Sequence, residues 1–403
     1  MTYSRQDVER LVEEENVRFI RLNFCDLYGN LKHKTIMAGE LSRAFDYGIS
    51  ADAWTVAGFD INESRSDIFL HPEPSAFKIL PWYSENEKTA RMFCRITLRD
   101  GRPFEGDSRY ILERAVEDAG NRGLYFTFGA EQEFYLFERD EKGKPTKKPW
   151  DNGSYLDEFP EDCCEDIRRE ICIAIESMGI IPESSHHEEG PGQNKIDYRA
   201  DSPVVSADNA LTFRSAVKTI AEIKGLYADF SPKPLEDRPG NGMHVNFTVA
   251  DAAGNDLVEG AAAGILAKMP EMTVFMNPEE ASYRRLGGGK APGYITWAYE
   301  NRSQLIRLKA ACEGYRIAEL RSPDSASNPY LVYALIIQAA LSGIENDLKL
   351  PEETAVNLFK AEREELKKYQ ELPNRLNEAR YNAASSDFIK GCFPMSVIAA
   401  YVK

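Results

Sequence analysis

Apolar and polar residues alternate along three short segments near the N-terminus, a pattern that predicts half-buried strands. Residues 17–24 (VRFIRLNF) and 31–37 (LKHKTIM) are separated by the turn-forming sequence DLYGN, so these two segments predict a hairpin. A third segment, residues 91–100, ends in an Asp-Gly turn. The N-terminal part therefore predicts a small, strand-rich domain.

Longer elements follow in the rest of the chain. Residues 108–123 carry apolar side chains at helical spacing, with Ser108 as the expected N-terminal cap and Gly123 at the end. Residues 164–179 predict a second amphipathic helix, and the strand-like run LYFTFGAEQEFYLFER lies between the two helices. Residues 328–348 are apolar on nearly every side, which predicts a helix buried in the core.

These elements predict an α+β protein of two domains. We expect a minor domain at residues 1–103 and a larger α+β domain at residues 104–403. The total length of 403 residues suits two or three domains. Hydrophobic residues make up 43% and charged residues 28%, as in ordinary soluble proteins, and the longest apolar stretches are too short to span a bilayer.

Charge and cysteine content narrow the class of protein. The net charge of -16 argues against broad neutralisation of nucleic-acid phosphates and against binding to a membrane surface, although a few arginines in one cleft can still bind phosphate. The seven cysteines form no CxxC pair, and the charged N-terminus lacks the apolar core of a signal peptide. We therefore expect an enzyme of the reducing cytoplasm with small-molecule substrates.

Glu131 and Glu133 lie two positions apart in the apolar strand and are the first candidates for chemistry. Side chains at i and i+2 of a strand share a face, so the two carboxylates stand side by side. Glutamates are commonly exposed, but the flanking YFTFGA and FYLF favour burial here, and buried acids need a positive partner. Hard oxygen ligands suit Mg²⁺ or Mn²⁺, so the pair predicts a divalent metal site.

Three further segments carry candidate residues. The run HHEEGPGQNKIDY (186–198) holds two histidines whose side chains diverge in a strand, so at most one joins a site, and a polar turn explains the segment equally well. The run GNGMHVNF (240–247) places small residues beside His244. Four arginines surround Glu319 and are either salt-bridge partners or ligands of phosphate and carboxylate: Arg302, Arg307, Arg316 and Arg321. Together the segments predict a site for a nucleotide phosphate and a carboxylate substrate.

Six motifs now carry a resemblance to a known family. GAEQEFYLF, HHEEGPGQNKID, KPLEDRPGNGMHVNF, SYRRLGGGKAP, NRSQLIRL and ELRSPDSASNPY occur in the order found in the glutamine synthetase family. RLNFCDLYGNLKHK and GISADAWTVAGF resemble the small β-grasp domain of those enzymes. The resemblance implies a β-grasp domain followed by a catalytic domain with a curved antiparallel sheet and helices. It also implies ATP as a substrate and two divalent metal ions, Mg²⁺ or Mn²⁺.

The resemblance assigns roles to the acidic residues. Glu131, His244 and Glu319 would hold the metal nearer the nucleotide. Glu133 and Glu188 would hold the metal nearer the amino-acid substrate.

The same resemblance assigns the substrate contacts. Arg302 and Arg307 would face the transferred phosphate, and Arg285 and Arg321 would clamp the substrate carboxylates. Gly240 would bring its backbone close to the substrate.

The remaining assignments concern the nucleotide and a neighbouring subunit. Asn246 and Thr248 would lie beside the nucleotide, with Asn246 in place of the usual histidine. Asp52 would reach the ammonium site of a neighbouring subunit, with Thr55 where serine is usual. Such sharing implies a homo-oligomer, and we expect a hexameric ring; whether two rings stack is left open.

Two lysines depart from the family pattern. Lys195 replaces the third glutamate of the substrate-side metal site, and an ammonium about 4 Å from a divalent ion costs on the order of 8 kcal/mol at an effective dielectric constant of about 20. Lys290 replaces the flap glutamate that takes a proton from ammonium. An extra residue between Arg316 and Glu319 leaves the role of Arg316 open.

We therefore expect an ATP-dependent carboxylate–amine ligase that works through a γ-glutamyl phosphate. It would join glutamate, or a related acid, to ammonia or preferentially to another amine. The alternative is a catalytically degenerate ring protein that serves as a nucleotide-binding scaffold or regulator. A weaker third hypothesis is phosphotransfer to a carboxylate or guanidino group.

Overall fold

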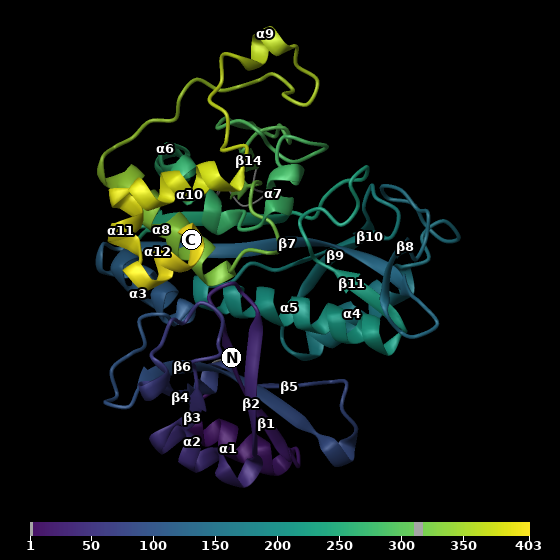
Figure 1. The fold of residues 1–403 in the computed structure, drawn as a ribbon, viewed down its shortest axis with the longest axis vertical. Coiled ribbons are helices and arrows are strands. Elements are labelled where there is room, and N and C mark those ends of the chain that lie inside the picture. Colours follow the sequence, from purple (N-terminus) through teal and green to yellow (C-terminus); the bar gives the residue numbers. More distant parts are fainter. Residues whose placement is uncertain (1–2, 310–316) are drawn as a thin grey trace.

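The computed structural model describes residues 3–309 and 317–403, which form two sheets with helices around them (Figure 1). The N-terminal sheet has six strands in the order β2-β1-β6-β4-β3, with β5 paired to β6. Its elements are α1 (Arg5–Glu14), β1 (Phe19–Cys25), β2 (Leu31–Met37), α2 (Leu41–Tyr47), β3 (Ile49–Asp52), β4 (Asp67–Pro72), β5 (Lys78–Ile79) and β6 (Thr89–Leu98). The expected hairpin is confirmed, because β1 and β2 pair antiparallel from Phe19↔Met37 to Cys25↔Leu31.

The turn of this hairpin attaches the N-terminal sheet to the rest of the molecule. Gly29 has a positive φ of 80°, and a Cβ there would lie 3.0 Å from the backbone of Asn328. The Asn328 side-chain amide donates to the carbonyl oxygens of Asp26 and Leu27, and the Tyr401 hydroxyl also donates to Leu27, at 2.6 Å. Hydrogen bonds at this tight turn therefore contribute to holding the two parts of the chain together.

The larger sheet has nine strands in the order β13-β14-β15-β12-β7-β10-β9, with β8 and β11 also paired to β7. Its strands are β7 (Leu124–Arg139), β8 (Pro145–Pro149), β9 (Pro182–His187), β10 (Gln193–Tyr198), β11 (Leu226–Asp229), β12 (Met243–Asp251), β13 (Trp297–Tyr299), β14 (Ile306–Lys309) and β15 (Ile317–Leu320). The long strand β7 runs through the middle and confirms the strand expected from its sequence (Figure 1).

Helices pack around this sheet and supply most of the core. They are α3 (Ser108–Asn121), α4 (Glu165–Ser177), α5 (Pro203–Ile223), α6 (Val258–Met276), α7 (Glu280–Arg285), α8 (Pro329–Glu345), α10 (Leu376–Ser385), α11 (Asp387–Cys392) and α12 (Met395–Val402). The short helix α9 (Arg363–Leu366) has no buried residue and lies away from the sheet (Figure 1). The expected buried helix is confirmed as α8, whose Tyr333 ring stacks on Phe128 of β7 at 4.5 Å between centroids. None of the helices in the described ranges is both long and apolar enough to cross a membrane.

One expectation about helix ends is wrong. The cap of α3 is Asp107, whose carboxylate accepts from the backbone N–H of Arg109, whereas Ser108 is the first helical residue and is buried. A carboxylate one position earlier reaches the free N–H groups of the first turn, so the serine is not needed as a cap. The α+β class is confirmed, and the domain border between residues 103 and 104 stays a prediction.

Helices α6 and α8 touch through glycines, which generates a stability prediction. A Cβ on Gly264 would lie 2.1 Å from the carbonyl oxygen of Ala339, and a Cβ on Gly343 would lie 2.2 Å from that of Gly260. Because backbone atoms cannot move aside cheaply, we expect Gly264→Ala to lower the free energy of unfolding by about 1–3 kcal/mol. Urea denaturation measures this change.

The matched control is Gly120→Ala in α3, where an added Cβ meets no atom of the described residues within 4 Å. It should raise stability by about 0.5–1 kcal/mol, since alanine is the better helix former. Equal unfolding midpoints for Gly264→Ala and Gly120→Ala would contradict the proposed close contact.

Candidate functional site

A cavity of about 260 Å³ opens on one face of the nine-stranded sheet. Acidic and basic side chains line it in nearly equal numbers. The acids are Glu131, Glu133, Glu188, Glu189, Asp197 and Glu319, and the bases are Lys195, Arg285, Lys290, Arg302, Arg307, Lys309 and Arg321, with His186, His244 and Gly240 also in the wall. The cavity thus gathers most of the residues that the sequence predicts for a site.

Strand register places the central residues. In β7, Glu131 and Glu133 are two positions apart and both face the cavity, as expected. Glu131 lies opposite His244 of β12, and Glu133 lies opposite Lys195 of β10. The Glu133 carboxylate also accepts the backbone N–H of Gly242 at 2.7 Å.

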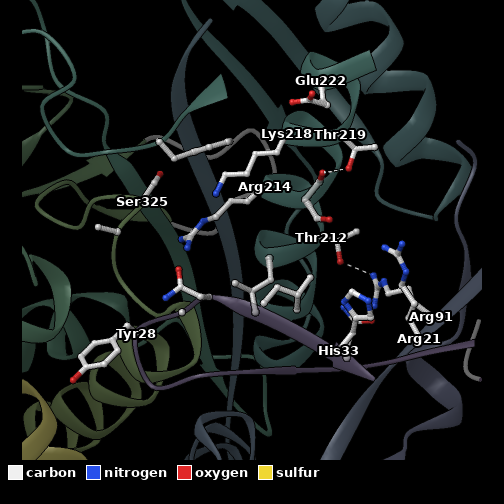
Figure 2. Close-up of a pocket in the computed structure, with 18 of the residues that line it drawn as sticks. Arg21, Tyr28, His33, Arg91, Thr212, Arg214, Lys218, Thr219, Glu222 and Ser325 are labelled. Carbon is white, nitrogen blue, oxygen red and sulfur yellow. Dashed lines mark hydrogen bonds between the residues drawn. The ribbon is translucent and has the colours of Figure 1, made fainter. Parts of the chain in front are cut away.

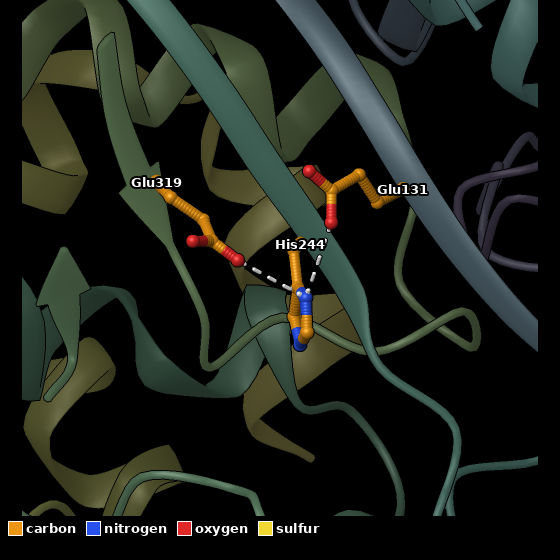
Figure 3. A group of neighbouring side chains, drawn as sticks. All are labelled: Glu131, His244 and Glu319. Carbon is orange, nitrogen blue, oxygen red and sulfur yellow. Dashed lines mark ion pairs between the residues drawn. The ribbon is translucent and has the colours of Figure 1, made fainter. Parts of the chain in front are cut away.

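Glu131, His244 and Glu319 form one compact group (Figure 3). One ligand atom from each residue lies within 4.8 Å of the others. The His244 Nδ1 atom is 3.6 Å from a Glu131 oxygen and 3.3 Å from a Glu319 oxygen, and it is buried without a hydrogen-bond partner. An imidazole nitrogen and two carboxylates with such an unsatisfied atom form a donor set that suits a divalent cation.

Cations and an amide already contact both oxygens of Glu131. The Lys195 ammonium lies 2.5 Å from Oε2, and Lys309 lies 2.9 Å from Oε1. The Asn246 amide donates to Oε1 at 2.6 Å. Burial would raise the pKa of Glu131, but Lys195, His244 and Lys309 together outweigh burial and hold that pKa well below its usual range.

The sequence assigned Lys195 to the metal site nearer the amino acid, whereas its closest contact is Glu131, a candidate ligand of the other site. Lys309 was missed altogether. The available signal was its spacing from Arg307, since residues two apart in a strand share a face.

Glu319 is held by two arginines. Its oxygens lie 2.9 Å from Arg307 and 2.5 Å from Arg321. Burial would raise the pKa of Glu319, but Arg321 and His244 overcome burial and hold that pKa below its ordinary value. The carboxylate is therefore charged throughout the physiological pH range.

The other expected arginines lie close by. Arg302 is exposed within the cavity wall and forms no ion pair with any residue that the structure describes. Arg285 is buried and donates to the backbone oxygens of Ser322 and Arg321, and burial lowers its pKa. Gly240 packs against it, since a Cβ there would lie 2.9 Å from Arg285 Cγ and 2.3 Å from a backbone oxygen.

The two adjacent histidines diverge, as expected. His186 lines the cavity 3.2 Å from the Glu188 carboxylate. His187 points into the protein and pairs with Asp151 at 2.9 Å. Burial would raise the pKa of Glu188, but His186 and Lys195 hold it below its usual value.

Lys290 lies at the rim of the cavity. Its ammonium is 2.8 Å from the Glu189 carboxylate and 4.6 Å from the centre of the Tyr155 ring. The positive charge of Lys290 is therefore neutralised within the chain, by Glu189.

Some predicted residues lie outside the cavity wall. Asp52 is exposed in the N-terminal sheet, where its carboxylate accepts the backbone N–H of Trp54. Thr248 lies on β12, two positions beyond Asn246, and its hydroxyl is hydrogen-bonded to that of Thr127. Arg316 falls outside the described residues.

The two expected metal sites differ in how well their residues fit an ion. Glu131, His244 and Glu319 fit one divalent cation if Lys195 and Lys309 move off Glu131. Glu133 and Glu188 share the cavity with Lys195, whose positive charge lowers the pKa of Glu188, so this second set does not fit a divalent cation.

Comparisons with known proteins agree with this geometry. The family model for the glutamine synthetase β-grasp domain matches residues 16–99, and that for the glutamine synthetase catalytic domain matches residues 105–403. A glutamine synthetase of Clostridium saccharobutylicum is 39% identical over 99% of this chain and 94% of its own, and one of Methanosarcina mazei is 40% identical over 99% and 92%.

Two solved structures of GmaS, one as its ADP complex and one without ligand, superpose with a TM-score of 0.88 at 25% identity. Each alignment covers 98% of this chain and 94% of the other. Sequence motifs, domain matches and fold therefore agree that this chain belongs to the glutamine synthetase family.

Proposed function

We propose that the protein joins the side-chain carboxylate of glutamate to an amine at the expense of ATP. The observation that carries this proposal is the placement of Arg302, Arg307 and Arg321 around the Glu131–His244–Glu319 group in one cavity. Guanidinium groups suit phosphate and carboxylate, and the acidic group suits a divalent cation. Family membership and the ADP complex of GmaS add support for the nucleotide.

Each step of the reaction has residues near it. A carboxylate oxygen attacks the γ-phosphorus of ATP, the bond to ADP breaks, and Arg302 and Arg307 offset the charge that develops on the phosphoryl oxygens. The amine nitrogen then attacks the acyl carbon, phosphate leaves, and the nitrogen loses a proton. Mg²⁺ or Mn²⁺ held by Glu131, His244 and Glu319 would add positive charge at the phosphates.

Charge at the rim favours an amine other than ammonia. Lys290 and Glu189 form a pair of zero net charge where the family flap supplies a negative carboxylate. A neutral pair gives little electrostatic attraction for ammonium. We therefore propose a larger amine that makes its own contacts with this rim, and the acidic group of an amino acid would suit Lys290.

An activity screen tests the proposal. With glutamate, ATP and Mg²⁺, ADP release should rise with at least one organic amine more than with ammonium. Arg302→Gln should lower kcat by about a hundredfold or more, because it removes a charge that faces the transferred phosphate. Arg199→Gln, an exposed residue that pairs with Glu183, is the matched control and should leave kcat unchanged.

Nucleotide binding without turnover of any glutamate–amine pair would overturn the ligase proposal. That result would instead favour the nucleotide-binding scaffold as the function.

The ion pairs of Lys195 and Lys309 with Glu131 lead to a separate prediction about metal binding. Replacing Lys195 or Lys309 by methionine keeps much of the side-chain volume. It removes a positive charge that lies beside Glu131, a candidate metal ligand. Each variant should bind Mn²⁺ at least about tenfold more tightly than the unchanged protein, since like charges repel strongly in a buried site. Calorimetric titration with MnCl₂ measures the change.

Lys290→Met is the control, because Lys290 pairs with Glu189 and not with Glu131. Unchanged Mn²⁺ affinity in both Lys195→Met and Lys309→Met would show that the lysines do not compete with the ion.

We further propose a hexameric ring in the cytoplasm in which Asp52 completes a neighbour's site. Asp52 is exposed and lies outside the cavity of its own chain, which supports a role between subunits. Asp52→Asn and Arg302→Gln should each be inactive alone. Unfolding and refolding the two together should restore about a quarter of the activity, since mixed rings contain sites with both native residues.

A mixture that stays inactive although mass spectrometry detects mixed rings would overturn the shared site. Light scattering on the unmixed protein gives the size of the assembly.

A further inference from the structure

A second cleft, of about 800 Å³, lies between the N-terminal sheet and helix α5 (Figure 2). Its walls come from β1, β2 and β6 on one side and from α5 on the other. Five basic side chains line it: Arg21, His33, Arg91, Arg214 and Lys218. None of them lines the cavity that holds Glu131 and Glu319. Nothing in the proposed ligase reaction uses this cleft.

The strand register concentrates positive charge on the sheet side. Arg91 of β6 lies opposite Arg21 of β1 on one side and opposite Lys78 of β5 on the other. Directly opposed residues share a face, and like charges in such positions repel each other. Figure 2 shows His33 beside Arg21 and Arg91 at this wall.

Helix α5 supplies the opposite wall. Arg214 and Lys218 are four residues apart, so they share one face of the helix. Arg214 is only 8% exposed, and its guanidinium bonds to the side-chain oxygen of Gln132 and the carbonyl of Ser327, which are both uncharged. Lys218 lies 5.8 Å from the centre of the Phe230 ring.

Residues 3–309 and 317–403 supply no carboxylate partner for these charges. Arg21, Arg91, Arg214 and Lys218 form no ion pair with any acid in the part of the chain that the structure describes. Arg91 donates instead to the Thr212 hydroxyl, and burial lowers its pKa to about 10. Burial also lowers the pKa of Arg214.

The acids near the cleft are engaged elsewhere. Asp208, which faces Arg91, accepts two hydrogen bonds from Arg109 and one from Tyr330. Glu222 lines the cleft but pairs with Arg139, and Glu279 lies at the N-terminus of α7. Four cations without an acidic partner among the described residues therefore leave a local excess of positive charge in a protein of net charge -16.

We propose that this cleft binds a small anion that carries two or more phosphate or carboxylate groups. Cations on two facing walls suit a ligand with an acidic group at each end, and guanidinium groups suit both kinds of oxyanion. The volume is that of a small-molecule site. Hydroxyl groups of Thr212 and Thr219 add uncharged hydrogen-bonding partners at the wall.

Calorimetry on the full-length protein tests the proposal with pyrophosphate and citrate as the two probes. Arg302→Gln serves as the background, so that binding in the ligase cavity is weakened. We expect at least one probe to bind, with an affinity that falls as ionic strength rises. Adding Lys218→Gln or Arg21→Gln should weaken that binding by about tenfold each.

Lys224→Gln is the matched control, because it removes the same charge from the end of the same helix while its partner Glu170 lies outside the cleft. It should leave probe binding unchanged. Tighter binding of pyrophosphate would identify a phosphate ligand, and tighter binding of citrate a carboxylate ligand.

Two results would overturn the proposal. One is the absence of binding by either probe at millimolar concentration in the Arg302→Gln background. The other is binding that Lys218→Gln and Arg21→Gln both leave unchanged. If these variants instead dissociate the assembly without any probe effect, the cleft receives a neighbouring subunit and not a small anion. None of these results bears on the ligase reaction.

Discussion

The pairing of β7 with its two neighbours is the constraint on which the rest of the site depends. Antiparallel register sets Glu131 opposite His244 on β12 and Glu133 opposite Lys195 on β10, and β15 then brings Glu319 beside β12. Because side chains alternate along a strand, a slip of one residue would turn every one of these groups to the other face. Glu131, His244 and Glu319 thus lie on rigid strands. Arg307 also lies on a strand, β14, whereas Arg285 lies on α7 and the other two arginines, Arg302 and Arg321, lie in loops.

Burial of carboxylates determines the electrostatics of this face. Glu131 and Glu319 are removed from solvent, and each remains charged because cations lie within hydrogen-bonding distance. A divalent ion and the ammonium groups of Lys195 and Lys309 provide the same kind of compensation, so they compete for the same oxygens.

The fold separates two concentrations of positive charge in an acidic protein. In the ligase cavity, arginines alternate with carboxylates and the charges nearly balance. In the cleft beside α5, cations line two facing walls, and the described residues supply no acid that forms an ion pair with Arg21, Arg91, Arg214 or Lys218. Arg214 connects the two regions, since its guanidinium bonds to Gln132, the residue between Glu131 and Glu133. The tight turn at Gly29 helps to hold the two parts of the chain together beside that cleft.

The sequence alone determined the local elements and the family. Hydrophobic alternation predicted β1, β2 and β7, helical periodicity predicted α3, α4 and α8, and ordered motifs identified the acids and arginines of the site, because these signals lie in neighbouring residues. Tertiary structure decided which charges meet. Lys195 lies opposite Glu133 in register yet contacts Glu131, Lys290 neutralises Glu189, and Lys309 enters a site to which no motif assigned it. Long charged side chains form ion pairs with residues on other strands and loops. The distances between the paired atoms depend on how the backbone packs, and no local sequence pattern encodes that packing.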